Sequence, residues 1–243
     1  MCGIFGYIGH RNASSLLVKG LLRLEYRGYD SSGVVVKNGQ LQSYKDIGKI
    51  SEMATSLPDI KGSMGIAHTR WATHGGVSKE NAHPHLSNDG KVAIVHNGIL
   101  QNSDALRKRL KRAGVQLNSE TDSEVFCHYI AMALEEGKAP LEALQSVLSM
   151  TRGTWGVCVL FQDYDYVLCA RNGSPLIIGR GKDEMLISSD PHAIREHTDQ
   201  LVALEDGQIA KLDAHDFQVM QTDGQEVESQ LLQLEEEWGE SEL

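Results

Sequence analysis

Cys2 is the residue whose position most clearly suggests chemistry, because it follows Met1 directly and opens the run CGIFGYIG. A small second residue permits removal of the initiator methionine, so we expect the mature chain to begin at Cys2. The thiol and a free α-amino group would then belong to one residue, and that amine has a reference pKa of about 7.7–8.0. It can take the thiol proton, directly or through a water molecule, and leave a thiolate nucleophile. The alternative is that Cys2 is a small apolar residue at the start of a strand.

Asn97 and Gly98 form a dipeptide suited to stabilising a negatively charged oxygen. An enzyme that attacks an amide must stabilise the charge that develops on the carbonyl oxygen. The side-chain N–H of Asn97 and an unhindered backbone N–H at Gly98 would supply two donors. The same dipeptide is also a common hairpin turn, and here it follows the apolar run 92–96. The dipeptide alone leaves both interpretations open.

Arg70 and Asp122 carry the charges that an amino-acid substrate requires. The planar guanidinium of Arg70 can bind an α-carboxylate through two hydrogen bonds. The carboxylate of Asp122 can bind an α-ammonium group. Asp122 also lies where a helix is expected to begin, so capping that helix or matching its dipole is the structural alternative, and the two roles are compatible.

The composition indicates a soluble globular protein with one large domain or two small ones. The chain has 243 residues, of which 41% are hydrophobic and 23% charged. Its net charge of −10 argues against a nucleic-acid partner, which would favour a basic surface. Glutamates crowd the C-terminal segment, and a solvated face explains them without a partner.

The cysteines indicate a reducing compartment. Cys2, Cys127, Cys158 and Cys169 show no paired spacing typical of a zinc knuckle or a disulfide framework. We expect the last three to be buried, inert thiols. The sequence also contains no apolar stretch of membrane-spanning length and no secretory signal pattern, so we expect a cytoplasmic protein without a membrane partner.

Periodicity predicts helices and short strands in the same domain. Apolar residues at helical spacing predict helices over about 16–24, 103–113, 122–136 and 140–148. After residue 152 the pattern changes to short apolar strands separated by turn residues at 163, 172–173, 206–207 and 223–224. Antiparallel sheets need helices to cover their apolar faces. We therefore expect an α+β fold, and a four-layer α/β/β/α sandwich of two antiparallel sheets fits this inventory.

Four further blocks accompany the N-terminal run: RLEYRGYDSSG at 23–33, HTRWATHG at 68–75, HNG at 96–98 and SETD at 119–122. In their order and spacing they closely resemble the glutaminase domain of glutamine–fructose-6-phosphate aminotransferases, which are class II glutamine amidotransferases. The resemblance covers essentially the whole chain. The versions YRGYD and RWATHG distinguish this branch from amidophosphoribosyltransferases and asparagine synthetases, which share the opening cysteine.

The resemblance implies an N-terminal nucleophile hydrolase fold and a set of site residues. It assigns the catalytic roles to Cys2, Asn97 and Gly98, and it assigns substrate binding to Arg70, Trp71, Thr73, His74 and Asp122. Trp71 would belong to a loop, from Arg70 to about Ser78, that closes over glutamine. Arg27 and Gly28 would pack beside the cysteine and support it. A structural ion pair between Arg27 and a carboxylate is the competing interpretation.

The implied reaction is hydrolysis of L-glutamine to L-glutamate and ammonia, with no metal and no organic cofactor. In the full-length enzyme the ammonia serves glucosamine-6-phosphate synthesis. Fructose-6-phosphate would bind only to sugar-isomerase domains that this chain lacks, and the full-length enzyme is expected to be a homo-oligomer. We expect residues 1–230 to form the glutaminase domain and residues 231–243 to form an acidic tail or the start of a linker.

Three alternatives remain. The chain could serve a different amidotransferase, although the block around Arg27 argues against that, or it could be a non-catalytic glutamine-sensing module. His83-Pro84-His85 lies among several histidines and could suggest metal binding. Hydrolytic zinc sites usually combine three protein ligands with water, and the sequence has no His-Glu-x-x-His run. We therefore expect His83 and His85 to organise the surrounding loop.

Overall fold

The N-terminal strand shows how alternation along the sequence builds the layers of this fold. Ile4 and Ile8 point to one side of the strand and pack in one apolar cluster, whereas Phe5 and Tyr7 point to the other side and pack in another. All four side chains are buried, so both faces of the strand are covered. Because side chains alternate with a period of two along a strand, such a strand must lie between two other layers.

A computed structural model describes residues 2–72, 75–228 and 232–233. The strands in these residues are β1 (Gly3–Gly9), β2 (Ser31–Asn38), β3 (Gln40–Ile47), β4 (Met64–Arg70), β5 (His85–Leu86), β6 (Val92–Leu100), β7 (Gly153–Phe161), β8 (Val167–Asn172), β9 (Ile177–Gly181), β10 (Glu184–Ser188), β11 (Gln200–Ala203), β12 (Gln208–Leu212), β13 (Phe217–Gln221) and β14 (Leu232–Gln233). The α-helices are α1 (Ala13–Arg23), α2 (Ile50–Ser56), α3 (Ser103–Arg112), α4 (Glu124–Glu135) and α5 (Pro140–Met150). Short 3-10 helices span Glu25–Arg27 and Pro191–Ala193.

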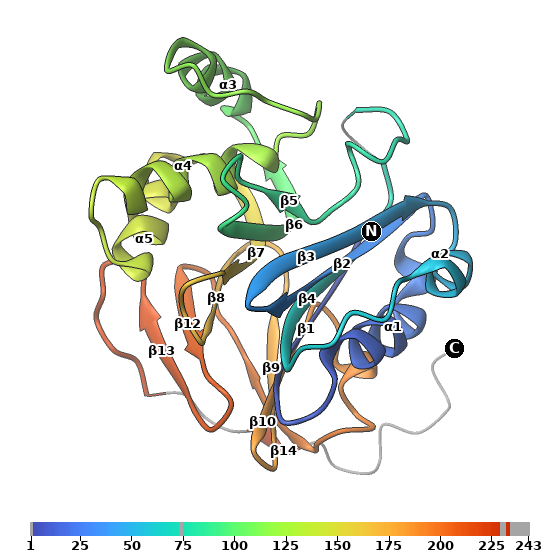
Figure 1. The fold of residues 1–243 in the computed structure, drawn as a ribbon. Coiled ribbons are helices and arrows are strands. Elements are labelled where there is room, and N and C mark those ends of the chain that lie inside the picture. The colour runs from blue at the N-terminus through green and yellow to red at the C-terminus, as the bar shows by residue number, and fades with distance from the viewer. Residues whose placement is uncertain (1, 73–74, 229–231, 234–243) are drawn as a thin grey trace.

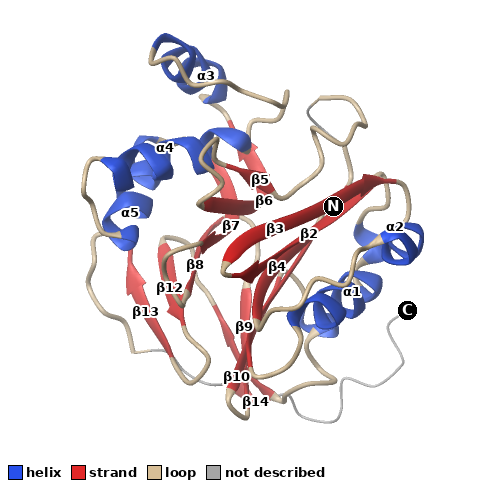
Figure 2. Cartoon of the chain, in the orientation of Figure 1, coloured by secondary structure: helices blue, strands red, loops and turns tan. Residues whose placement is uncertain are grey.

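The strands form two antiparallel sheets. The first, sheet A, has the order β14-β11-β9-β10-β1-β4-β2-β3, and the second, sheet B, has the order β13-β12-β8-β7-β6-β5. Figures 1 and 2 show α1 and α2 on one side of the stacked sheets and α4 and α5 on the other, with α3 projecting beyond sheet B.

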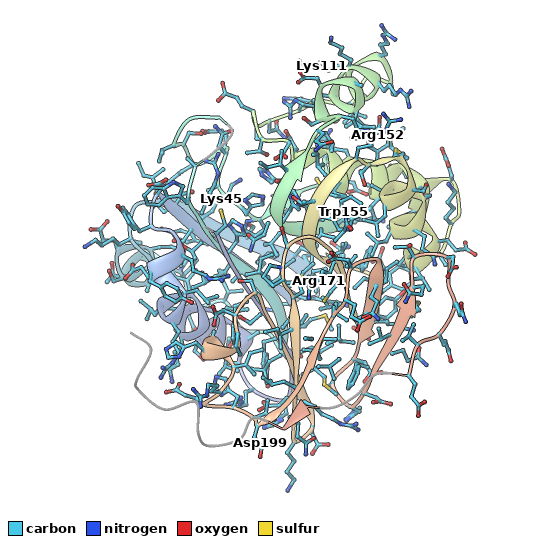
Figure 3. The ribbon with its side chains drawn as sticks, turned by 180° about the vertical axis from the view of Figure 1, so that it is seen from behind. Lys45, Lys111, Arg152, Trp155, Arg171 and Asp199 are labelled. Atoms are coloured by element: carbon cyan, nitrogen blue, oxygen red, sulfur yellow. The ribbon has the colours of Figure 1, made fainter. Side chains whose placement is uncertain are left out.

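Three apolar clusters fill the spaces between the four layers. The first cluster lies between α1, α2 and sheet A, and the second lies between the two sheets. The third lies between sheet B and helices α3 to α5, and it includes Trp155 of β7, which is labelled in Figure 3. The predicted α+β fold with an α/β/β/α sandwich of antiparallel sheets is confirmed.

Two local features differ from the sequence-based expectations. Helix α4 begins at Glu124 rather than at Asp122, and Asn97-Gly98 lies inside strand β6 rather than in a hairpin turn. The hairpin turn, one of the two interpretations left open for this dipeptide, is excluded because the dipeptide is paired along its length with β7, in the register Asn97 to Gly156 and Gly98 to Trp155. Strands β3, β4, β5 and β14 and helix α2 are absent from the sequence-based expectations.

The C-terminal strand falls in the segment expected to be a tail or linker. Leu232 and Gln233 pair with Leu201 and Gln200 of β11 at the edge of sheet A. The other residues of 231–243 lie outside the described part of the chain, so the boundary at residue 230 stays a prediction. In the described residues, no helix combines the length and the apolar character that crossing a bilayer would require.

Candidate active site

The Cys2 side chain lies against the backbone of Trp71. The Trp71 N–H donates to the Cys2 sulfur at 3.3 Å, and the sulfur lies 3.6 Å from the Trp71 carbonyl oxygen. Sheet register creates this contact, because β1 and β4 are antiparallel neighbours with Gly3 opposite Thr69. This pairing brings Cys2, which precedes Gly3, close to Arg70 and Trp71, which follow Thr69.

The surroundings of Cys2 act on its thiol in opposite directions. Burial raises the pKa of the thiol, and the carboxylate of Asp30 adds to the rise. The hydrogen bond from the Trp71 N–H and the positive charge of Arg70 lower the same pKa, without cancelling the effect of burial. A base is therefore needed to form the thiolate at neutral pH.

Asn97 lies beside the nucleophile. Its Nδ2 donates to the carbonyl oxygen of Cys2 at 3.1 Å, and its Oδ1 lies 2.9 Å from Nε2 of His68. Asn97 belongs to sheet B and Cys2 precedes the first strand of sheet A, so the bond joins the two sheets. The structure thus brings together the predicted nucleophile and the predicted oxyanion donor.

Gly98 is required by the close approach of β7. Its φ is +139°, in a region that side-chain-bearing residues rarely adopt, and a Cβ at this position would lie 2.1 Å from the carbonyl oxygen of Thr154. Glycine is therefore the residue that fits this strand position, directly after the residue that contacts Cys2.

Arg70 is buried at the end of β4, with 4% of its surface exposed. Burial lowers the pKa of its guanidinium, whereas the negative charges of Cys2, Asp30 and Asp122 raise it. Its Nη1 donates to the carbonyl oxygen of Gly76 at 3.1 Å. Arg70 thus lies within electrostatic reach of Cys2 and Asp122 and is hydrogen-bonded to the following loop.

Asp122 accepts a hydrogen bond from β6 rather than capping the helix that follows it. Its Oδ2 accepts from the Leu100 N–H at 2.7 Å, and its Oδ1 accepts from the Ser123 hydroxyl at 3.2 Å. Ser123 is the N-cap residue of α4, and no side chain caps that helix end. Asp122 therefore forms no capping bond to α4, whose N-cap it directly precedes, and its carboxylate is anchored at the edge where β6 ends.

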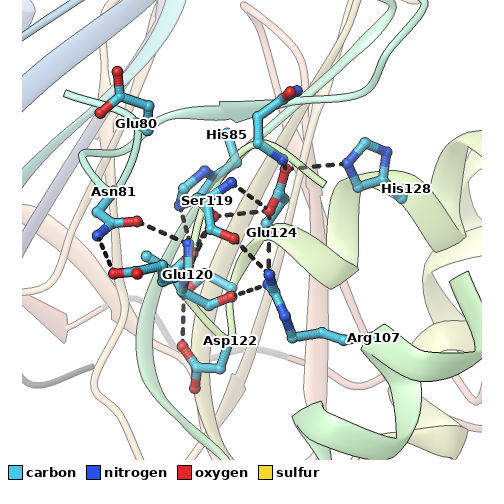
Figure 4. A network of polar contacts seen from close by, with 12 residues as sticks. Glu80, Asn81, His85, Arg107, Ser119, Glu120, Asp122, Glu124 and His128 are labelled. Carbon is cyan, nitrogen blue, oxygen red and sulfur yellow. Dashed lines mark hydrogen bonds and ion pairs between the residues drawn. The ribbon is translucent and has the colours of Figure 1, made fainter. Parts of the chain in front are cut away.

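A polar network holds the loop after Arg70 against the segment that carries Asp122. Nδ2 of Asn81 donates to the Gly76 carbonyl at 3.0 Å and to Oε2 of Glu120 at 3.2 Å, and its Oδ1 accepts from the Glu120 N–H at 2.8 Å. The Gly76 N–H also donates to Oε2 of Glu120, at 3.3 Å. Figure 4 shows Asn81 and Glu120 facing each other on one side of Asp122.

The same segment is held from its other side by Glu124. This buried carboxylate accepts from the backbone N–H groups of Asn118 and Ser119 at 2.6 and 3.0 Å, and it lies 3.6 Å from Nη1 of Arg107. His128 lies 3.4 Å from it on the next helical turn (Figure 4). The segment that carries Asp122 is therefore held by Asn81 at Glu120 and by Glu124 at Asn118 and Ser119.

Trp71 itself is 44% exposed, and its ring meets Tyr29 edge-on with centroids 5.4 Å apart. An exposed aromatic beside the nucleophile fits the predicted role of a residue that closes over a substrate. Thr73 and His74, the other predicted substrate contacts of this loop, lie outside the described residues.

Gly28 and Arg27 support the site in different ways. A Cβ on Gly28 would lie 2.8 Å from the Arg70 carbonyl carbon and 2.9 Å from the Trp71 nitrogen, so the glycine allows the backbone that holds Cys2 to pass. Arg27 forms an ion pair with Asp190 at 3.3 Å and donates to the Ser189 carbonyl at 3.2 Å. This is the structural ion pair that we considered as the alternative for Arg27.

The histidines form a buried group between the sheets. The rings of His68 and His83 have centroids 4.1 Å apart, and those of His83 and His85 are 4.5 Å apart. Burial lowers the pKa of all three rings, that of His68 to about 3, so they are neutral near pH 7. Within the described ranges, no group of three or more His, Cys, Asp or Glu side chains is arranged to hold a metal ion. Cys127, Cys158 and Cys169 are fully buried, free thiols.

Sequence reasoning missed three residues that contact this site. Asp30 accepts from the Ala72 N–H at 2.8 Å, and the Ser189 hydroxyl accepts from the Ile4 N–H at 3.0 Å. Asn81 ties the loop to Glu120, as described above. Asp30 lies within the sequence block 23–33, so that block could have pointed to it as a site residue. Asn81 and Ser189 had no such signal.

Comparison with known proteins identifies the family. A model of the glutamine amidotransferase domain matches residues 68–196. Over 241 residues the chain is 42% identical to the glutamine–fructose-6-phosphate aminotransferase (isomerizing) of Pseudomonas putida, covering 97% of this chain and 39% of that protein. Over 216 residues it is 46% identical to the protein of the same name from Bacteroides thetaiotaomicron, covering 86% of this chain and 35% of that one. The chain thus spans about two fifths of the length of these relatives.

A solved structure supports the same assignment. The glutamine phosphoribosylpyrophosphate amidotransferase of B. subtilis, determined with ADP and GMP, superposes with a TM-score of 0.80 at 27% identity, over 91% of this chain and 49% of that one. The matched domain model includes Arg70, Asn97 and Asp122, whose geometry is given above. The chain belongs to the glutamine amidotransferase domain family.

Proposed function

We propose that this chain hydrolyses L-glutamine to L-glutamate and ammonia, with Cys2 as an N-terminal nucleophile. The observation that carries the proposal is the meeting of three groups from separate strands. The Cys2 thiol accepts a hydrogen bond from the Trp71 N–H, and the Asn97 side-chain amide donates one to the Cys2 carbonyl oxygen. The guanidinium of Arg70 lies within electrostatic reach of Cys2.

The first half of the reaction forms a thioester. Once Met1 is removed, the α-amine of Cys2 takes the thiol proton, and the thiolate attacks the side-chain carbonyl carbon of glutamine. The carbonyl oxygen becomes an oxyanion, stabilised by the side-chain N–H of Asn97 and a backbone N–H at Gly98. The carbon–nitrogen bond then breaks, and the protonated amine gives its proton to the departing ammonia.

The second half releases glutamate. Water attacks the γ-glutamyl thioester, and the amine of Cys2 accepts a proton from that water. The carbon–sulfur bond breaks, the thiol is restored, and one water molecule has been consumed for each glutamine.

The charged head of glutamine is proposed to bind between Arg70 and Asp122. The guanidinium would take the α-carboxylate and the carboxylate would take the α-ammonium. Both side chains are buried, so these charges act with little screening by solvent. Trp71, Thr73 and His74 are proposed as further substrate contacts, and Arg27 and Gly28 as supports for the nucleophile.

The proposed biological role is the supply of ammonia for aminosugar synthesis. The relatives are named for an amino transfer from glutamine to fructose-6-phosphate and are longer than this chain. In a protein of their length, fructose-6-phosphate would bind outside the region matched here, and we propose a homo-oligomer for that longer protein. We propose residues 1–230 as the functional unit, and the cytoplasm as its location because a reducing compartment keeps the Cys2 thiol free.

The test combines intact mass with a glutaminase assay on one untagged sample. The expected result is a mass that lacks Met1, glutamate production, and loss of that activity after thiol alkylation. Cys2→Ala is expected to retain glutamine binding and lose hydrolysis. A chain that lacks Met1 and makes no glutamate contradicts the proposal, and robust turnover by a chain with an extension before Cys2 contradicts the role of the amine.

A further inference from the structure

We infer that His68 is a positioning residue that holds the side-chain amide of Asn97 with its NH₂ group directed at Cys2. The inference rests on the proposed hydrolysis and deepens it, because it names the group that orients the oxyanion donor.

The carbonyl oxygen of Cys2 determines which way the amide of Asn97 faces. A backbone carbonyl can only accept a hydrogen bond, so the Asn97 atom at 3.1 Å from it must be the nitrogen. The amide oxygen then faces His68, 2.9 Å from Nε2. An amide oxygen can only accept, so Nε2 of His68 must carry the hydrogen and Nδ1 must be the unprotonated nitrogen.

The position of His68 in the fold allows it to donate to Asn97. It lies on β4 in sheet A, on the face that carries Ile66, and Asn97 lies on β6 in sheet B, on the face that carries Val95. The bond between them therefore crosses the space between the two sheets. His68 is fully buried, so water cannot readily replace it as the donor to Asn97.

The neighbouring histidine restrains the ring of His68. His83 packs against it with centroids 4.1 Å apart and planes tilted by 40°. Among the described residues, neither ring nitrogen of His83 forms a hydrogen bond, and Nδ1 of His68 has no hydrogen-bond partner. The ring of His68 is held by its bond to Asn97 and by an interaction with the backbone of His96, the residue before Asn97. Packing fixes the plane of the imidazole, and the bond to Asn97 selects its tautomer.

The consequence for catalysis concerns the transition state. One N–H of the Asn97 amide donates to Cys2, and the second is available to a developing oxyanion next to the same residue. Without the donor on His68, the bond to the Cys2 carbonyl alone holds the amide, and the amide can tilt so that its second N–H no longer points at the oxyanion. Because Arg70 and Asp122 hold the head of the substrate, loss of His68 is expected to lower kcat and to leave KM nearly unchanged.

The first experiment reads the tautomer in the wild-type chain. The protein is labelled with ¹⁵N at histidine, and its two-bond ¹H–¹⁵N spectrum is recorded near pH 7.5. The expected result is a His68 ring protonated at Nε2 and unprotonated at Nδ1, with the resonance assigned by its loss in a His68 variant. A ring protonated at Nδ1 overturns the inference.

The second experiment compares two substitutions of similar size. His68→Gln places an amide donor near the position of Nε2, and His68→Met removes the donor. His68→Met is expected to lower kcat on the order of tenfold, less than the 10²–10³-fold typical of removing an oxyanion donor itself. His68→Gln is expected to recover most of that loss.

A double-mutant cycle separates positioning from a general structural effect. In an Asn97→Ala background, His68→Met is expected to cost less than about twofold in kcat, because no amide remains to be oriented. Equal losses in both backgrounds overturn the inference. If His68→Met does not fold, the tautomer measurement on the wild-type chain decides.

The outcomes also separate this inference from the proposed function. A wild-type chain that does not hydrolyse glutamine contradicts the proposed function, whatever the tautomer. An active wild-type chain whose His68→Met variant keeps its full kcat contradicts only the positioning role.

Discussion

The backbone nitrogen of Trp71 lies 3.3 Å from the sulfur of Cys2, so the donor in this contact is a main-chain N–H. The antiparallel pairing of β1 with β4 brings the backbone of Trp71 to Cys2, so the position of the donor does not depend on the Trp71 side chain. A thiolate formed at Cys2 would therefore find a hydrogen-bond donor already in place, at a position that only a shift of backbone could disturb.

Gly28→Ala is expected to disturb that backbone. The added methyl group would lie 2.8 Å from the carbonyl carbon of Arg70, and backbone atoms cannot move aside as a flexible side chain can. We expect the Trp71 N–H to shift from Cys2 and kcat/KM to fall at least about tenfold, which corresponds to about 1.4 kcal/mol. The measurement is steady-state glutaminase kinetics on a variant shown to be folded by circular dichroism.

Gly39→Ala serves as the control for Gly28→Ala. Gly39 has a φ of +69° in the turn between β2 and β3, and nothing lies within 4 Å of an added Cβ. We expect a loss of stability of about 1 kcal/mol from the left-handed backbone, with unchanged activity. If both variants lose activity equally, the close approach at Gly28 is not the cause.

Asp122→Asn is expected to weaken recognition of the substrate ammonium without disrupting the fold. The oxygen of the asparagine can still accept from the Leu100 N–H, which the aspartate accepts at 2.7 Å. The negative charge is lost, so KM for L-glutamine is expected to rise by about tenfold or more, because a buried charged pair contributes more than a neutral hydrogen bond. Steady-state kinetics with L-glutamine measure this change.

Glutaramate, which lacks the α-ammonium group of glutamine, provides the matched comparison. The Asp122→Asn substitution is expected to change its hydrolysis much less than that of L-glutamine. Equal losses on the two substrates would show that Asp122 acts through the structure of the site rather than through the ammonium.

Asn81→Ala is expected to loosen the loop that follows Arg70. The substitution removes three hydrogen bonds, those of Asn81 to the Gly76 carbonyl, to Oε2 of Glu120 and to the Glu120 N–H. We expect KM for glutamine to rise several-fold and the free energy of unfolding to fall by about 1–3 kcal/mol. Kinetics and urea unfolding on the same sample measure both.

The control is Asn88→Ala, at an exposed position where Nδ2 donates to the Gln116 carbonyl at 3.2 Å. Both its KM and its stability are expected to stay close to wild type. An Asn81→Ala variant with a wild-type KM would show that the network around Glu120 does not affect substrate binding.

The stability of the fold is expected to decrease as the pH falls below 6.5. Burial lowers the pKa of His68 from 6.5 to about 3, so the unfolded chain binds a proton in this range that the folded chain does not. At pH 5.5 this single group lowers the free energy of unfolding by about 1.4 kcal/mol relative to pH 7.5. His83, His85 and His96, whose pKa values are also lowered by burial, act in the same direction.

Urea unfolding at pH 7.5 and pH 5.5 measures this effect. His68→Gln is expected to show a smaller difference between the two pH values, because one titrating group is gone. A free energy of unfolding that is equal at the two pH values would contradict the buried, neutral state of these rings.

The sequence by itself determined the type of fold and the main chemical groups. Side chains alternate with a period of two along a strand, so Phe5 and Tyr7 face one side of β1 and Ile4 and Ile8 face the other. Because both sets are apolar, the local sequence is enough to indicate a strand with two buried faces. The family resemblance rested on contiguous blocks, so it identified Cys2 and Asn97 without any knowledge of their distance.

Only the tertiary structure decided how these groups meet. Asn97-Gly98 is a turn by local propensity, but pairing with β7 keeps it in a strand, because the ladder of backbone pairs with β7 outweighs the preference of a dipeptide. The bonds of Asp122 to β6 and of Asn97 to His68 join residues 22 and 29 positions apart. Periodicity and propensity report local order, whereas these contacts depend on sheet register and on the stacking of two sheets.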